Sequence, residues 1–328
     1  MKNYYILKSG RLRRKQNTLY LETKEEKRAI PINDIEALYI FGEVDINTKL
    51  LIFLSQNKIP VHFFNYYDLY IGSFYPREYL NSGIIIVNQV KYYLDNEKRI
   101  EIAKEIVDAA IYNITKNLKY YSKHEKEVDE LIQKIENEKA KINAAKDIKE
   151  LMGIEGKSRQ YYYQSFDKIL RKGFEFEKRT RGPPENMINC LISFGNSLLY
   201  TVCLTEIYHT QLNPTISYLH EPFERRFSLA LDIAEIFKPI IVDRVIFNLI
   251  NNRLIKDEHF DKQLNFCYLN DKGKRIFIEH FDEKLKTTIK HKDLKRSISY
   301  QHLIRIECYK LINHLIGDKK FSAFRIWW

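Results

Sequence analysis

The chain has 328 residues, enough for two domains, and its 45% hydrophobic content excludes global disorder. Its net charge of +11 at pH 7 favours a negatively charged partner, although charge alone does not identify one. Four cysteines without a C-x-x-C pair give no support to a zinc ribbon or a redox motif. The N-terminus lacks the features of a signal peptide, and no apolar run is expected to reach membrane-spanning length. We therefore expect a cytoplasmic protein with no membrane partner.

Residues 1–82 are expected to form a small β-rich domain. Short runs of β-branched and aromatic residues alternate there with turn pairs such as Ser9-Gly10. One helix is expected within this domain, over residues 46–56, where leucines recur at helical spacing. Residues 83–92 are expected to form a linker to the rest of the chain.

Residues 93–328 are expected to form a larger, all-helical domain, which makes the fold class α+β with two domains. The stretch 84–152 contains neither glycine nor proline, which argues for long helices. Gly153 and Gly156 are expected to end this region, and a new helix should begin near Glu155. Further helices are expected over residues 186–204, from residue 243 and over residues 298–316, with a small hairpin over residues 266–278.

Glu155 lies between Gly153 and Gly156 in the sequence LMGIEG. As the opening residue of a helix, its carboxylate would complement the helix dipole and cap free N–H groups. Alternatively, Glu155 is a metal ligand, and the glycines let the backbone approach a ligand closely. The residues at this position leave both interpretations open.

His220 stands just before Glu221 and Pro222 in the sequence YLHEP. Because proline suits the first turn of a helix, we expect His220 to lie just outside a helix start. It is either a surface or interface histidine without a role, or a ligand for a metal ion.

Asp232 and Glu235 lie three residues apart in an otherwise apolar run, so both face the same side of a helix. A carboxylate buried in such a helix costs several kcal/mol unless it is paired or coordinated. Arg225 shares a face with Asp232 and is a possible ion-pair partner for it. A metal ion shared by Glu235 and His220 would require a helix break between them, for which Ser228 is a plausible N-cap.

With these three stretches in this order, the chain resembles the CRISPR-associated Cas1 family, the integrase subunit of spacer acquisition, along its whole length. The matching patterns begin with the glycine-flanked Glu155, followed by aromatic residues, and a Leu-His pair that ends at His220. The acid-x-x-acid pair of the family corresponds to Asp232 and Glu235, although many members carry aspartate where Glu235 stands. Residues 181–189 match a further Arg-x-Pro-Pro and Asn-x-x-Asn segment.

The resemblance implies an N-terminal β-rich domain that dimerises and a C-terminal all-α catalytic domain. It implies that Glu155, His220 and Glu235 are the catalytic residues and the ligands of Mg²⁺ or Mn²⁺. Asp232 and Asn189 would support them. It also implies three partners: double-stranded DNA, a second copy of the chain in a homodimer, and a Cas2 subunit.

The activity that the resemblance implies is that of a metal-dependent DNA integrase and endonuclease of CRISPR adaptation. It would join the 3′-hydroxyl ends of captured DNA fragments to the CRISPR repeat by transesterification. One alternative is a metal-dependent nuclease or resolvase of branched DNA, in which water is the nucleophile. The other is a non-catalytic DNA-binding scaffold in which the acids are structural.

Basic residues provide candidates for contacts with DNA phosphates. For any single one of them, a solvated position on the surface is the simpler interpretation. The candidates are Arg225, Arg226, Lys284, Lys286, Lys290, Lys292, Lys295 and Arg296.

Overall fold

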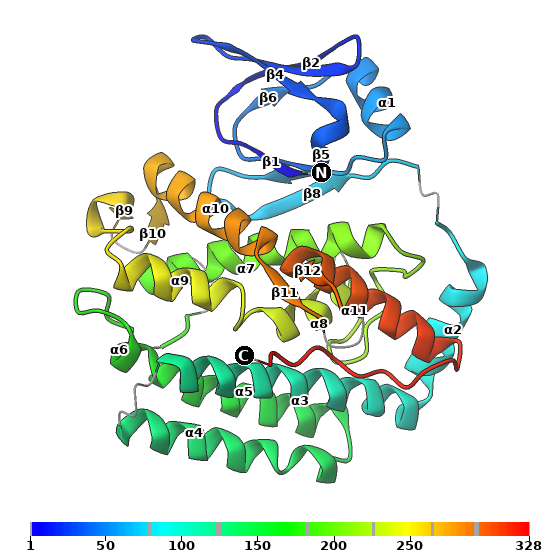
Figure 1. Ribbon diagram of the computed structural model, residues 1–328, viewed down its shortest axis with the longest axis vertical. Helices are drawn as coiled ribbons and strands as arrows, with labels where there is room; N and C mark the ends of the chain where they lie inside the picture. The colour runs from blue at the N-terminus through cyan, green and yellow to red at the C-terminus, as the bar shows by residue number, and fades with distance from the viewer. Residues whose placement is uncertain are drawn as a thin grey trace. The chain divides into compact units, whose positions relative to one another are not determined.

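The computed structural model describes residues 2–77, 80–121, 126–176, 178–180, 184–224, 227–263, 266–291 and 295–327 (Figure 1). The chain divides into two compact units, Met1–Asn81 and Ser82–Trp328. The first unit is rich in strands and the second is mostly helical. The prediction of an α+β fold is therefore confirmed.

The strands and the helix of the first unit follow one another closely along the chain. They are β1 Lys2–Ile6, β2 Gly10–Lys15, β3 Thr18–Glu22, β4 Lys27–Pro31, β5 Ile35–Ile40, β6 Val44–Asp45, α1 Thr48–Gln56, β7 Val61–Phe64 and β8 Tyr70–Phe74. One sheet has the order β1-β5-β7-β8, in which β1, β5 and β7 pair in parallel and β8 is antiparallel to β7. The other sheet has the order β4-β3-β2-β6.

The core of the first unit forms because apolar residues alternate with polar ones along its strands. Leu12 of β2 and Leu38 of β5 are almost completely buried in one cluster, to which α1 adds Leu50. Asn47 caps α1 by accepting a hydrogen bond from the backbone N–H of Leu50 at 3.0 Å. The helix expected over residues 46–56 is thus confirmed.

The second unit is built mainly from helices (Figure 1). Their bounds are α2 Gly83–Leu94, α3 Asn96–Tyr121, α4 Lys126–Lys139, α5 Ile148–Gln164, α6 Phe166–Ile169, α7 Met187–Tyr208, α8 Ser228–Phe237, α9 Val242–Asn251, α10 Asp271–Lys286 and α11 Tyr300–Leu315. Short strands pair as β9 Phe260–Gln263 with β10 Phe266–Leu269, and as β11 Thr288–Lys290 with β12 Ser297–Ser299. Helices α3, α4 and α5 pack against one another, and α8 packs against both α3 and α7.

Helices α2, α3 and α4 confirm that the stretch without glycine or proline is helical. Residues 83–92, which we expected to form a linker, instead lie within α2 and belong to the second unit. The buried side chain of Gln89 explains this placement. Its Nε2 donates to the backbone oxygen of Asn213 at 3.1 Å, and its Oε1 accepts from the backbone N–H of Asn213 at 2.8 Å.

The hairpin that we predicted over residues 266–278 is wrong in its second half. Strand β10 is present, but it pairs with β9, and the residues after it begin α10. Asn270 is the reason, because its Oδ1 accepts a hydrogen bond from the backbone N–H of Gly273 at 3.0 Å. This is the hydrogen bond of a helix N-cap rather than of a hairpin turn.

Helix α7 corrects the expectation that no apolar run reaches membrane-spanning length. Among the described residues, it is long and apolar enough to cross a membrane by length and composition. However, 72% of its apolar window is buried. A Cβ on Gly195 in this helix would come within 2.5 Å of Val242, which shows how closely α9 approaches it. Such burial is typical of the central helix of a globular core.

Candidate active site

Glu155 lies in the interior of α5 and not at its start. Asp147 caps this helix by accepting a hydrogen bond from the backbone N–H of Glu150 at 2.8 Å. The prediction that a helix begins near Glu155 is therefore wrong, and the helix-dipole interpretation of its carboxylate loses its basis. A Cβ on Gly153 or Gly156 would meet nothing within 4 Å, so the surface on either side of Glu155 is open.

Asp232 holds the loop that carries His220. Its buried carboxylate accepts hydrogen bonds from the backbone N–H groups of Tyr218, Leu219 and His220 at 2.7 to 3.0 Å. The Nδ1 of His220 also donates to it at 2.8 Å. Burial alone would lower the pKa of His220, but this hydrogen bond and the charge of Asp232 raise it above its usual value. A carboxylate on one ring nitrogen fixes the imidazole and leaves the other nitrogen for a ligand.

The segment between His220 and α8 differs from our expectation in detail. No helix begins at Pro222, so His220 does not lie beside a helix start. Helix α8 begins at Ser228, which confirms that His220 and the acid pair Asp232 and Glu235 do not lie on one continuous helix. Ser228 does not cap this helix, because the N-cap is Phe227 and the Ser228 hydroxyl donates to the backbone oxygen of Thr215 at 2.9 Å.

Arg159 joins the two candidate carboxylates. Its Nε donates to Glu155 at 2.6 Å, and its Nη2 donates to Glu235. The Nζ of Lys238 donates to the second carboxylate oxygen of Glu235. Burial would raise the pKa of Glu235, but the guanidinium and the ammonium hold it well below its ordinary range. The negative charge of the two carboxylates is therefore matched by Arg159 and Lys238.

This donor set fits a divalent cation in its chemistry. Carboxylate oxygens and an imidazole nitrogen are ligands for Mg²⁺ and Mn²⁺, and Asp232 orients His220 as an outer carboxylate orients a metal-bound histidine. As the side chains stand, the described residues contain no cluster of three or more His, Cys, Asp or Glu that could hold an ion. The guanidinium of Arg159 instead takes up oxygens of both Glu155 and Glu235.

Sequence reasoning missed Arg159 and Lys238. Both lie at the spacing of intrahelical ion pairs, four residues after Glu155 and three residues after Glu235. A search for basic partners at those spacings would have found them. It would not have shown that Arg159 reaches Glu235, because that contact depends on how α5 and α8 pack.

Asn189 lies in the first turn of α7, where its side chain fixes the preceding segment. Its Oδ1 accepts from the Nη1 of Arg179 at 2.9 Å and from the backbone N–H of Thr180 at 3.2 Å. Its Nδ2 donates to the backbone oxygen of Lys178 at 2.9 Å. Within the described part of the chain, these contacts do not bring Asn189 to the carboxylates of Glu155 and Glu235.

The basic candidates for DNA contacts differ in their environments. Lys284 is half-buried, with its Nζ 4.2 Å from the ring centroid of Tyr300, and burial lowers its pKa to about 8. It is therefore poorly placed to grip a phosphate, and Lys286 pairs with Asp282. The exposed candidates are Lys290, Lys295 and Arg296. Three further candidates lie outside the described residues: Arg225, Arg226 and Lys292. The expected pairing of Arg225 with Asp232 therefore lies outside them as well.

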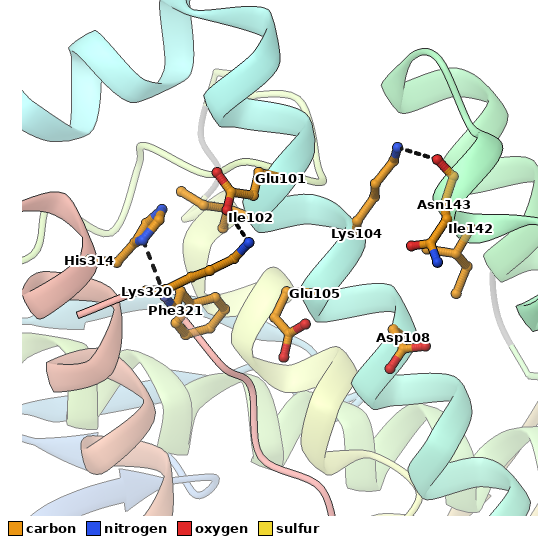
Figure 2. Close-up of a pocket in the computed structure, with 10 residues that line it drawn as sticks. All are labelled: Glu101, Ile102, Lys104, Glu105, Asp108, Ile142, Asn143, His314, Lys320 and Phe321. Carbon is orange, nitrogen blue, oxygen red and sulfur yellow. Dashed lines mark hydrogen bonds and ion pairs between the residues drawn. The ribbon is translucent and has the colours of Figure 1, made fainter. Parts of the chain in front are cut away.

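A cavity of about 390 Å³ opens along α3 among a different set of residues (Figure 2). Its acidic side chains, Glu101, Glu105 and Asp108, come from successive turns of that helix. Lys320 pairs with Glu101 at 2.7 Å, and Arg325 pairs with Glu105 and Asp108 at 2.6 Å each. Because the C-terminal segment neutralises these carboxylates, we assign the cavity no catalytic role.

A further buried acid, Asp243, lies in the first turn of α9. The hydroxyl of Tyr162 donates to it at 2.9 Å, and the Nδ2 of Asn117 donates to that hydroxyl at 2.8 Å. Burial raises the pKa of Asp243 to about 6. The network thus connects α3, α5 and α9 behind the candidate site.

Replacing Asp243 by asparagine is expected to change how stability depends on pH. The folded-state pKa of about 6 lies above the ordinary value of 3.8, so this carboxyl favours folding at acid pH. That contribution is lost as the pH rises through about 6. Asparagine does not ionise, so the variant should gain stability relative to the wild type between about pH 4 and about pH 6, with little further change above that range. Urea unfolding at several pH values measures the difference, and a difference that does not vary with pH would contradict the expectation.

Comparison with known sequences identifies relatives over the full length of the chain. The family model described as CRISPR associated protein Cas1 matches residues 4–283. A protein of Thermodesulfovibrio yellowstonii named CRISPR-associated endonuclease Cas1 3 is 53% identical over 329 residues and covers 100% of both chains. One of Moorella thermoacetica, named CRISPR-associated endonuclease Cas1 2, is 50% identical over 328 residues, again with 100% of both chains covered.

Solved structures show the same fold. A Cas1 protein from Thermotoga maritima superposes with a TM-score of 0.90 at 45% identity, covering 99% of this chain and 100% of its own. A casposase bound to an integration product superposes with a TM-score of 0.88 at 22% identity, covering 100% of this chain and 95% of its own. The second likeness concerns the fold alone.

Proposed function

The chain belongs to the CRISPR-associated Cas1 family, and from this we propose that it is an integrase and endonuclease of CRISPR adaptation. Its reaction would be the joining of the 3′-hydroxyl ends of captured DNA fragments to the CRISPR repeat by transesterification. The observation that carries the proposal is the joint placement of Glu155 and Glu235 on one guanidinium, with His220 held nearby by Asp232.

Mg²⁺ or Mn²⁺, held by Glu155, His220 and Glu235, would supply Lewis acidity at the reacting phosphate. The chain itself supplies position and charge. Asp232 fixes the ring of His220 through Nδ1 and, through three backbone N–H groups, fixes the loop behind it. Arg159 lies at the same carboxylates, and its guanidinium would bring positive charge close to a phosphate bound there, which would favour the transition state of phosphoryl transfer.

Partners follow from the same premise. Double-stranded DNA suits the net charge of +11, and a fold neighbour of 21% identity is a Cas6-RT-Cas1–Cas2 complex, so we propose a Cas2 subunit as a second partner. We further propose a homodimer through the first unit, in the cytoplasm. The edge strand β8 and the turn before it expose apolar side chains that such an interface would cover, namely Tyr66, Tyr67, Leu69 and Ile71.

A donor DNA that lacks the 3′-hydroxyl tests the proposed reaction. A labelled fragment with a 3′-hydroxyl should be joined to a repeat-containing target in the presence of Mn²⁺, whereas a 3′-deoxy fragment should give no joined product, because the hydroxyl oxygen is the nucleophile. Both reactions are measured on a denaturing gel. Equal cleavage of the target with either donor, and no joining, would assign the chain to the water-using nucleases, an alternative that the relatives' designation as endonucleases favours.

A further inference from the structure

Arg179 is fixed in place by uncharged groups. Its Nη1 donates to the Oδ1 of Asn189 at 2.9 Å and to the backbone oxygen of Thr180 at 3.3 Å. Its Nη2 donates to the hydroxyl of Ser193 at 2.9 Å. Asn189 and Ser193 are one turn apart on α7, so this helix presents two acceptors to one guanidinium.

The charge of Arg179 has no counterpart in the part of the chain that the structure describes. No carboxylate there lies within ion-pair distance of it, and the acceptors that it uses are all neutral. A guanidinium has five N–H groups, and three are used here. The Nε–H and one Nη2–H remain without an acceptor among the described residues. A partly buried charge of this kind is costly unless an anion binds to it.

Arg179 lies beside the candidate active site, close to both Tyr163 and Arg159. Phe176 packs on Tyr163 of α5 with ring centroids 5.4 Å apart, which places the segment before Arg179 against that helix. Burial raises the pKa of Tyr163, and the guanidinium groups of Arg159 and Arg179 both oppose this because both are close to the phenol. Burial lowers the pKa of Arg179, and the charge of Arg159 lowers it further.

We propose that Arg179 binds a phosphate group of DNA and thereby positions the phosphodiester that reacts at the neighbouring carboxylates. Its remaining N–H groups lie on adjacent nitrogens, a spacing that matches two oxygens of one phosphate. Asn189 and Ser193 hold the guanidinium before DNA arrives, so little side-chain freedom is lost on binding. The inference rests on the proposed function for the identity of its ligand, and it gives Asn189 its supporting role through Arg179.

A double-mutant cycle between Arg179 and single phosphates tests the inference. Binding of the full chain is measured, without added divalent ion, to a branched DNA that represents the joined product. Methylphosphonate linkages remove the charge of one phosphate at a time around the branch point. In the wild type, one linkage should weaken binding about tenfold. Arg179→Gln should bind the unmodified DNA about tenfold more weakly and lose nothing further at that linkage.

Two variants serve as controls. Arg179→Lys should keep part of the effect of that linkage, because it keeps the charge but not the paired N–H groups. Lys172→Gln removes an exposed charge from the same segment and should keep the full tenfold effect. If Arg179→Gln keeps the full effect at every linkage, the inference is overturned. Should Arg179→Gln fail to fold, Arg179→Lys decides in the same cycle, and an undiminished effect there overturns the inference.

The joining assay separates this inference from the proposed function. A wild type that shows the coupling but joins no DNA would keep the phosphate contact and overturn the function. If the wild type joins DNA but the cycle shows no coupling between Arg179 and any phosphate, the proposed function stands and the phosphate contact is overturned. Mn²⁺ should raise the melting temperature of Arg179→Gln as much as that of the wild type, because Arg179 is not a candidate ligand. If Mn²⁺ no longer raises the melting temperature of Arg179→Gln, Arg179 instead shapes the geometry of Glu155, His220 and Glu235, which would count against phosphate binding.

Discussion

Glu235→Gln is expected to slow DNA joining about a thousandfold or more, while DNA binding at fixed salt stays within about twofold of the wild type. Glutamine keeps the size of the side chain but removes the charge that Arg159 and Lys238 match in this buried position. Affinity for DNA should survive because it comes from basic side chains that reach phosphates. Strand transfer of a labelled fragment with Mn²⁺ measures the first quantity, and filter binding measures the second.

Glu307→Gln is the matched control, since Glu307 is also buried, pairs with Lys310 and accepts the backbone N–H of Phe324 at 2.9 Å. It should lower stability without slowing joining. Mn²⁺ should raise the melting temperature of the wild type and of this control, because an ion that binds only the native state stabilises that state. It should not raise the melting temperature of Glu235→Gln, which lacks one of the proposed ligands. Undiminished joining by Glu235→Gln would make Glu235 an ion-pair partner only. If Glu235→Gln loses DNA binding, Glu235 is needed for DNA affinity as well as for the joining reaction.

Asp232→Ala is expected to lower the free energy of unfolding by about 3 kcal/mol or more. The carboxylate is completely buried and accepts three backbone N–H groups as well as the Nδ1 of His220. Alanine would remove the acceptor that these donors use in the folded protein. Asp232→Asn should destabilise less but still slow joining, because an amide nitrogen cannot accept the N–H groups that orient His220.

Urea unfolding measures the loss, and Asp95→Ala provides the comparison. Asp95 also accepts backbone N–H groups, those of Glu97 and Lys98 at 3.1 Å each, but it does so at the surface before α3. Its replacement should cost about 1 kcal/mol. If Asp232→Ala were no more destabilised than Asp95→Ala, the loop around His220 would have to be held by other contacts.

Helices and strands were predicted correctly where the local sequence pattern favoured one kind of element only. The absence of glycine and proline over residues 84–152 correctly predicted helices, and alternation with turn pairs correctly predicted the strands of the first unit. The errors arose where signals competed. Gly153 and Gly156 suggested a helix end, yet each glycine in a helix costs only about 1 kcal/mol, and burial of Leu151 and Ile154 on the same helix outweighs it.

The sequence selects a set of residues for the candidate site, and their assignment as ligands stays a prediction, but it does not give their arrangement. Glu155, His220 and Glu235 could be selected because their residue types and order match a family pattern. The partners of Asp232 could not, since they are backbone N–H groups of a loop whose conformation depends on how α8 packs against α3 and α7. Asp232 lies inside α8 and not at its N-cap, so no local sequence pattern shows that its carboxylate binds the main chain of residues 218–220.

Arg159 gives the site an internal substitute for a divalent ion. Together with Lys238, its guanidinium already matches the charge of Glu155 and Glu235, so no metal ion is needed to offset that charge in the fold. An ion that takes the same oxygens must displace the guanidinium, so its apparent affinity is the difference between two interactions. A strong set of ligands can in this way give a weakly held ion. If a divalent ion does bind there, activity should rise with the free ion concentration, and the protein should stay folded when the ion is absent.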